Sequence, residues 1–241
     1  MKKVFWCKNC VAMSTRPRIT FDERNYCSAC QWSEKKKNLD WNLREKTLIN
    51  LLEKHKSKKN QFDCIVAVSG GKDGSYVSHN LKHKYNLNPL TVTIRPHTET
   101  EIGIKNLNNF INSGYNNILV SPDEVAMRKL NKLGLTEMGF PYYGWLISVH
   151  TAVLRVALQF NISLVFYSED GEVEYGGDAN NIDKGVYGVD YIKSSYLENG
   201  YDKILKMSKL SDKQLFWFKF PTEEELEKEE LEKKKLKNVE L

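Results

Sequence analysis

The sequence lacks the long apolar runs that mark membrane spans and secretory leaders. None of its apolar stretches approaches the ~20 residues that are needed to cross a bilayer. A polar Cys-Lys-Asn-Cys segment follows directly after the first six residues, so the apolar region of a signal peptide is missing. We therefore expect a cytoplasmic protein that does not insert into a membrane.

The chain also has little net charge. Lys and Arg total 36 against 31 Asp and Glu, which gives +5 at neutral pH. The lysines are scattered or lie in short clusters, as at 35–37 and 233–235, and this pattern is typical of a solvated surface. We predict no nucleic-acid partner. With 41% hydrophobic and 28% charged residues in 241 positions, the composition indicates one large globular domain or two small ones.

Cysteine is scarce, and four of the five cysteines form two C-x-x-C pairs separated by sixteen residues. This spacing is typical of a four-cysteine zinc ribbon, in which each pair gives two thiolates to one metal. A disulfide framework is disfavoured in a cytosolic chain, whereas an iron–sulfur cluster remains an alternative. The four cysteines leave no spare ligand position and no histidine is nearby, which indicates a structural site. The predicted ligands are Cys7, Cys10, Cys27 and Cys30.

A glycine-rich turn follows the buried-strand pattern at 61–68. Ser69, Gly70 and Gly71 carry little bulk, and the helix predicted after them has N–H groups without partners inside the helix. A strand, a glycine turn and a helix N-terminus together form a seat for a polyphosphate. Lys72 adds a positive charge, although the spacing is neither that of a Walker loop nor G-x-G-x-x-G. A tight turn without a ligand is the alternative.

The remaining chain alternates between strand and helix patterns. Strands are predicted at 61–68, 88–94, 117–121 and 162–167, with helices at 76–84, 101–113, 122–133 and 145–160, and an irregular segment at 134–144. This alternation predicts an α/β fold with a doubly wound, mainly parallel sheet. The predicted domains are a ribbon at 1–37, a linking helix at 38–60, a nucleotide domain at 61–220 and a charged helical tail at 221–241.

An acidic segment follows the last predicted strand. Residues 168–178 contain five acids in eleven positions, at the point where a parallel strand meets the ligand crevice. Mg²⁺ together with a nucleotide would offset the repulsion, because carboxylate oxygens suit this cation. Glu169 and Asp170 lie nearest the strand end and are the first candidates. An exposed acidic loop is the alternative.

Residues 69–75, SGGKDGS, resemble the pyrophosphate-binding loop of the ATP pyrophosphatase (PP-loop) superfamily, which is usually written SGGxDS. Further matching segments are the two C-x-x-C pairs, TRPRITFD, LKHKYNLNPLTVT and LVFYSEDGEVEYGG. With them, the chain resembles the N-acetyl sugar amidotransferases of that superfamily. Those enzymes act on sugars of bacterial surface polysaccharide, such as the O-antigen of lipopolysaccharide, and of flagellin.

The resemblance implies an activity and a set of residues. ATP would activate the acetamido oxygen of a sugar, which is free or nucleotide-linked, and ammonia from a partner glutaminase would give an acetamidino group. Pyrophosphate would bind at Ser69, Gly70, Gly71, Lys72, Asp73, Gly74 and Ser75. Adenosine would lie beside the second strand near Thr93. Lys72, Asp73, Glu169 and Asp170 would serve catalysis, the two last through Mg²⁺ or the substrate amide.

The chain departs from the family pattern in two ways. Gly74 separates Asp73 from Ser75, so the residue that supplies the loop hydroxyl is open. The family members also extend further at the C-terminus. The alternatives are a tRNA-thiolating enzyme of the same superfamily, which would need more cysteines and a stronger basic face, and an inactive remnant that binds a nucleotide or a partner.

Overall fold

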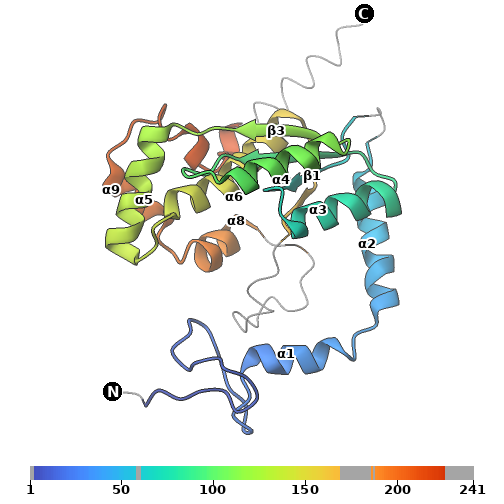
Figure 1. Ribbon diagram of the computed structural model, residues 1–241, viewed down its shortest axis with the longest axis vertical. Helices are drawn as coiled ribbons and strands as arrows, with labels where there is room; N and C mark the ends of the chain where they lie inside the picture. The colour runs from blue at the N-terminus through green and yellow to red at the C-terminus, as the bar shows by residue number, and fades with distance from the viewer. Residues whose placement is uncertain (1–2, 58–60, 169–185, 187, 226–241) are drawn as a thin grey trace, which may run out of the picture. The chain divides into compact units, whose positions relative to one another are not determined.

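The computed structural model describes residues 3–57, 61–168, 186 and 188–225. The chain divides into two compact units (Figure 1). The first contains Met1–Asn50 and Glu169–Tyr196, and the second contains Leu51–Ser168 and Leu197–Leu241. The sequence-based domain boundaries remain a prediction.

Among its described residues, the first unit has few regular elements. Helix α1 (Ser28–Lys36) begins directly after Cys27 and contains Cys30, and α2 (Trp41–His55) begins in this unit and ends in the second. A short helix α8 (Val189–Tyr191) continues into a π-helix, η3 (Ile192–Tyr196). Two isolated antiparallel bridges join Trp6 to Met13 and Phe21 to Cys27. The small core is built around buried cysteines.

The second unit contains a parallel sheet of four strands. They are β1 (Cys64–Ala67), β2 (Pro89–Ile94), β3 (Asn116–Val120) and β4 (Val165–Phe166), in the order β3-β2-β1-β4. In the register of the central pair, Ala67 lies beside Val92. The fourth strand is shorter than predicted, because only Val165 and Phe166 pair with β1.

Helices connect these strands. Helix α3 (Lys72–His79) with the π-helix η1 (Asn80–Lys84) leads to β2, and α4 (Glu101–Asn112) leads to β3. Helices α5 (Glu124–Met138) and α6 (Tyr143–Gln159) lead back to β4 beyond β1. Since parallel crossovers are right-handed, the reversal places α5 and α6 on the opposite face from α3 and α4. The predicted doubly wound parallel α/β fold is therefore confirmed (Figure 1).

The two faces of the sheet differ in polarity. On the face that α6 covers, apolar side chains of the strands and the helix form the main core: Ile65, Leu90, Val92, Ile94, Ala152, Val153 and Val156. Alternation along the strands places Thr91 and Thr93 on the other face, where both are buried. Asn117 Nδ2 donates to the hydroxyl oxygens of Thr91 and Thr93 at 2.9 and 3.0 Å. This network satisfies polar groups beneath α3 and α4.

Helix α5 continues further than the sequence indicated. The segment 134–144 was expected to be irregular, but residues 134–138 belong to α5 and residues 143–144 to α6, so that prediction was wrong at both ends of the segment. A Cβ at Gly134 would lie 2.2 Å from Tyr143 Cβ, which shows how closely α5 and α6 approach there. Glycine is thus kept inside the helix by packing, and the helix ends at Gly139, where φ is +71°.

The chain after the sheet packs against α5 and α6. Helix α9 (Tyr201–Ser208) and a 3₁₀ turn, η4 (Phe216–Phe218), precede a capping box. There Glu225 N–H donates to Thr222 Oγ1 at 3.2 Å, and Thr222 N–H donates to Glu225 Oε2 at 2.8 Å. Across the described segments, none of the helices has both the length and the apolar character of a membrane span.

Candidate functional site

The turn between β1 and α3 is tightly packed against α4. Val68 N–H donates to Val92 O at 2.9 Å, which extends the pairing to the last residue before the turn. Gly70 has φ +80°, and a Cβ there would lie 2.6 Å from backbone atoms of Leu107. Both its conformation and the approach of α4 therefore require glycine at this position.

Gly74 fits helix α3 against the end of β1. It is buried, and a Cβ would lie 3.2 Å from the Val68 side chain. The next residue, Ser75, donates its hydroxyl to Gly71 O at 2.8 Å. The extra glycine thus lies on the strand-facing side of the helix, and the Ser75 hydroxyl bonds to the backbone of the turn itself.

The N-terminus of α3 is open, in contrast to those of the next two helices. Thr100 caps α4 by accepting from Gly103 N–H at 3.2 Å, and Asp123 caps α5 by accepting from Ala126 N–H at 2.8 Å. Gly71 gives α3 no side-chain cap among the described residues. Its first N–H groups and the helix dipole therefore remain available to an anion. Lys72 is exposed there and pairs with Asp73 at 2.7 Å.

A cavity of about 140 Å³ adjoins this turn. Ser69 from the turn and Thr93 from β2 line it, together with residues of the β2–α4 connection and α4. Most of the remaining wall is apolar and comes from Ile94, Ile104, Leu107, Leu119 and Trp145. We call this cavity the loop cavity. Its size and apolar lining suit a flat heterocycle whose polar part faces the turn.

The structure brings most of the predicted nucleotide residues together. The seven residues 69–75 form one turn and helix start, and Thr93 lies on the neighbouring strand and shares the loop cavity with Ser69. Glu169 and Asp170 lie outside the described residues. The roles of all these residues remain predictions.

Two residues of the site were missed by sequence reasoning. Asn117 holds the Thr93 hydroxyl, and its signal was a polar residue inside a predicted strand. Trp145 lines the loop cavity, and its Nε1 donates to Ile94 O at 3.4 Å. No local pattern could reveal Trp145, because its place depends on how α6 returns across the sheet.

The four cysteines of the first unit form a compact cluster, in which all four sulfur atoms lie within 4.8 Å of one another. Cys7 Sγ is 3.9 Å from Cys30 Sγ, and Cys10 Sγ is 3.6 Å from Cys27 Sγ. Sulfurs at ~2.3 Å from a tetrahedral zinc would be about 3.8 Å apart, whereas a disulfide requires about 2.0 Å. All five cysteines are free thiols, and this group could hold a zinc ion.

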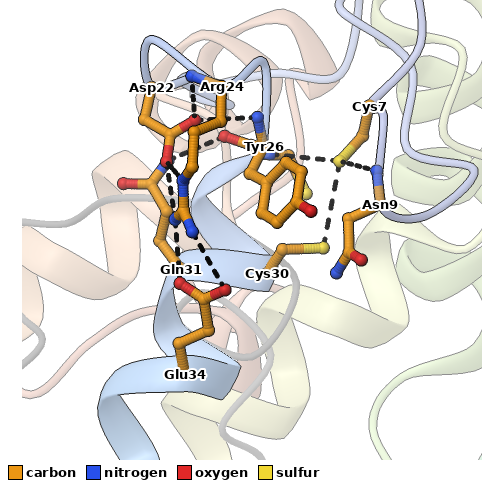
Figure 2. A network of polar contacts seen from close by, with 9 residues as sticks. Cys7, Asn9, Asp22, Arg24, Tyr26, Cys30, Gln31 and Glu34 are labelled. Atoms are coloured by element: carbon orange, nitrogen blue, oxygen red, sulfur yellow. Dashed lines mark hydrogen bonds and ion pairs between the residues drawn. The ribbon is translucent and has the colours of Figure 1, made fainter.

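The backbone supports thiolate at one of these positions. Burial raises the pKa of the Cys7 thiol, but N–H groups of Cys27, Asn9 and Cys10 outweigh this effect and lower its pKa to about 6. Cys27 and Asn9 donate to its sulfur at 3.2 and 3.4 Å (Figure 2). Burial instead raises the pKa of the Cys30 thiol to about 12. A cation among the sulfurs would favour the thiolate form of Cys30 despite its burial, because metal-bound thiols are deprotonated.

A network of contacts around Arg24, which we call the Arg24 web, stabilises the loop between the cysteine pairs (Figure 2). Arg24 donates to Asp22 at 2.8 Å and holds Glu34 of α1 through two bonds of 3.2 and 2.8 Å. Its guanidinium also lies over the Tyr26 ring, 4.4 Å from the centroid. Asp22 in turn accepts from the backbone N–H of Tyr26 at 2.9 Å. The web fixes α1, which carries Cys30, relative to the loop.

The fifth cysteine is not part of the sulfur cluster. Cys64 lies on β1 and is fully buried. Burial, with a smaller effect of Asp63, raises the pKa of its thiol to about 12. A thiol of this kind is inert as a nucleophile, because the thiolate is the reactive form.

Comparisons with known proteins give no family assignment. No protein-family model matches the chain, and no curated protein matches it significantly. Three of the similar solved structures are a predicted tRNA methyltransferase subunit from Methanocaldococcus jannaschii, an NH3-dependent NAD synthetase from Campylobacter jejuni and an NMN synthetase from Francisella tularensis.

These similarities are weak. The first has 19% identity over 60% of this chain and 73% of the other, with a TM-score of 0.36. The second has 14% identity over 76% and 99%, with a TM-score of 0.38. The third has 13% identity over 88% and 97%, with a TM-score of 0.34. At TM-scores this low, none of them establishes a shared fold or activity.

Proposed function

We propose that the chain is an ATP-dependent enzyme of the PP-loop superfamily that converts the N-acetyl group of a sugar into an acetamidino group. The observation that carries this proposal is the uncapped N-terminus of α3, which opens beside a cavity lined by Ser69 and Thr93. A polyphosphate at the turn and a base in the loop cavity would together account for both features.

The reaction would take place in two steps. The acetamido oxygen attacks the α-phosphorus of ATP, an O–P bond forms, and the bond to the β-phosphate oxygen breaks to release pyrophosphate. Ammonia then adds to the activated carbon, the C–O bond to AMP breaks, and AMP leaves with that oxygen. Loss of one proton from the added nitrogen gives the amidinium, and loss of a second proton gives the neutral amidine.

The residues of the turn would bind and release pyrophosphate. Backbone N–H groups at the start of α3 and the Lys72 ammonium would stabilise the negative charge that develops on the leaving group. Asp73 would position Lys72 through the ion pair of 2.7 Å. Mg²⁺ would shield the phosphates when bound, and Glu169 and Asp170 remain the proposed ligands.

Ammonia would come from a separate glutaminase subunit. Four of the five cysteines lie in the sulfur cluster, and the buried Cys64 is unsuited to act as a glutaminase nucleophile. The cluster itself would hold a structural zinc ion through Cys7, Cys10, Cys27 and Cys30, because four thiolates fill a tetrahedral shell.

The test is pyrophosphate release from ATP and Mg²⁺ with ammonium chloride and a panel of N-acetylated sugars, free and nucleotide-linked. We expect release that depends on one sugar and falls about a hundredfold in Lys72→Ala, the matched variant being Lys132→Ala on the exposed face of α5. Mass spectrometry of the sugar should show oxygen replaced by NH. ATP binding without release in the presence of every sugar would contradict the proposal and favour the inactive remnant.

A further inference from the structure

A second cavity lies beside the loop cavity at the same edge of the sheet. It has a volume of about 230 Å³ and is bounded by the segment after β2, the segment after β3 and the start of α5. We call it the strand-end cavity. Pro96 and Glu99 line both cavities, so the two adjoin one another. Ligands of open α/β sheets bind at this edge, outside the carboxyl ends of the strands.

The two cavities differ in chemistry. Apolar side chains dominate the loop cavity, whereas Arg95, His97, Ser121 and Glu124 line the strand-end cavity. An apolar wall suits a nucleobase, and a wall of carboxylate, hydroxyl, imidazole and guanidinium groups suits a ligand with many hydroxyls. The carboxylates of Glu99 and Glu124 also disfavour a polyphosphate in this second space.

Glu99 lies at the border between the two cavities, and Arg95 binds only one of its two carboxylate oxygens. Arg95 donates to it from Nε at 3.0 Å and from Nη2 at 2.7 Å, and both bonds end on Oε2. Within the described part of the chain, Oε1 is therefore left for a ligand. The two Arg95 donors converge on Oε2 and hold that oxygen in place.

From this geometry we propose that the strand-end cavity binds the hydroxyl-rich ring of the acceptor sugar, with Glu99 Oε1 accepting from one of its hydroxyl groups. This inference rests on the proposed function. The nucleotide and the acceptor then meet at the border formed by Pro96 and Glu99. There the acetamido oxygen can approach the α-phosphate from the side opposite the turn.

Filling each cavity separately tests the assignment. Ser121→Trp places bulk in the strand-end cavity, and Leu119→Trp places bulk in the loop cavity, since each residue lines only one of them. Lys132→Trp, on the exposed face of α5 and outside both cavities, is the matched control. The probes are a non-hydrolysable ATP analogue with Mg²⁺ and UDP-N-acetylglucosamine, with free N-acetylglucosamine in a parallel titration.

We expect Ser121→Trp to weaken binding of the sugar probe at least about tenfold and that of the ATP analogue less than about twofold, and Leu119→Trp to do the reverse. Hydrogen exchange of the β1 and β2 amides checks that each variant retains the sheet. Equal losses of both probes in either variant, or no effect of Ser121→Trp on the sugar, overturn the assignment.

Failure of the reaction is distinguishable from failure of the assignment. If both probes bind with the expected pattern but no pyrophosphate forms with any sugar, the proposed reaction is wrong and the two binding cavities stand. If the ATP analogue binds while neither sugar probe binds at millimolar concentration, the strand-end cavity is not a site for an acetamido sugar.

Discussion

The two units of this chain reach an ordered structure by different means. In the second unit (the sheet unit), apolar residues such as Ile65, Val92 and Val153 are excluded from water between β1, β2 and α6. In the first unit (the cysteine unit), the buried core consists of three cysteines, and the Arg24 web links the loop between the cysteine pairs to α1. A short segment that cannot bury much apolar surface depends on cross-links or a metal, so the two units should respond to different perturbations.

Metal removal should produce the largest difference in stability between the two units. A structural zinc contributes ~10–16 kcal/mol to folding of small domains, so a chelator or Cys27→Ser should abolish protection of the amides around the cluster. Amides of β1 and β2 should stay protected, because their core contains none of the four ligands. Metal analysis with hydrogen exchange of the intact chain measures both effects.

Cys64→Ala is the matched control for this experiment, since it removes a thiol outside the cluster. It should keep one metal ion per chain. A Cys27→Ser chain that retained full metal content and full protection of residues 7–30 would contradict the predicted zinc site.

Gly70→Ala should produce the next largest effect, in the sheet unit alone. The new Cβ would meet the Leu107 backbone at 2.6 Å in addition to the cost of φ +80°, so we expect a loss of about 4 kcal/mol and of nucleotide binding. Gly139→Ala is matched in conformation, with φ +71°, but no atom lies within 4 Å of its Cβ. It should cost only about 1 kcal/mol and leave binding intact. Urea unfolding and ATP-analogue titration compare them, and equal costs would argue against close packing of the turn on α4.

Acidification should destabilise the sheet unit through His150 on α6. Burial lowers the pKa of this imidazole to about 4. Because the unfolded chain binds the proton near pH 6.5 and the folded chain does not, stability is complete above that pH and falls by about 3 kcal/mol as the pH drops to about 4. Exchange of the β1 and β2 amides between pH 7 and 4 follows the change. His150→Gln should flatten the profile in this window, and an unchanged slope would assign the effect to other groups.

The smallest effects on stability are expected from replacing two arginines, one buried and one exposed. Arg155 has a side chain only 7% exposed and donates to Glu225 at 2.9 Å and to Lys219 O at 2.8 Å, so Arg155→Met should cost about 2 kcal/mol in the sheet unit. Arg24 is 52% exposed, and Arg24→Met should lower the stability of the cysteine unit less than Arg155→Met lowers that of the sheet unit, because water screens an exposed ion pair. Thermal unfolding followed by exchange in each unit provides the values. A larger loss for Arg24→Met would show that the web, rather than the metal, holds that unit.

Local patterns were sufficient to predict the sheet and its turn from the sequence. The apolar run that ends in Gly70 and Gly71 identified β1 and the start of α3, because strands and glycine turns have signals within a few residues. The cysteine spacing likewise predicted a cluster that the structure assembles. The alternation of strands and helices predicted a parallel sheet, and the observed strand order confirms it.

Other features depend on contacts between distant segments. The role of Gly74 could not be read from the sequence, because it follows from the rotation of α3 against Val68. The strand-end cavity arises from the meeting of Arg95 and Glu99 with Ser121, and the extension of α5 through Gly134 depends on Tyr143. Such packing has no sequence signature of its own.

Because Cys64 is completely buried, the reactivity of the thiols can report separately on the folding of the two units. An alkylating reagent applied to the folded, metal-loaded protein should meet little reactive sulfur, because four thiols would be coordinated and the fifth is inside the sheet. Labelling of four cysteines would then record loss of the metal, and labelling of Cys64 would record opening of β1. Counting adducts by mass would thus give the two stabilities from one sample.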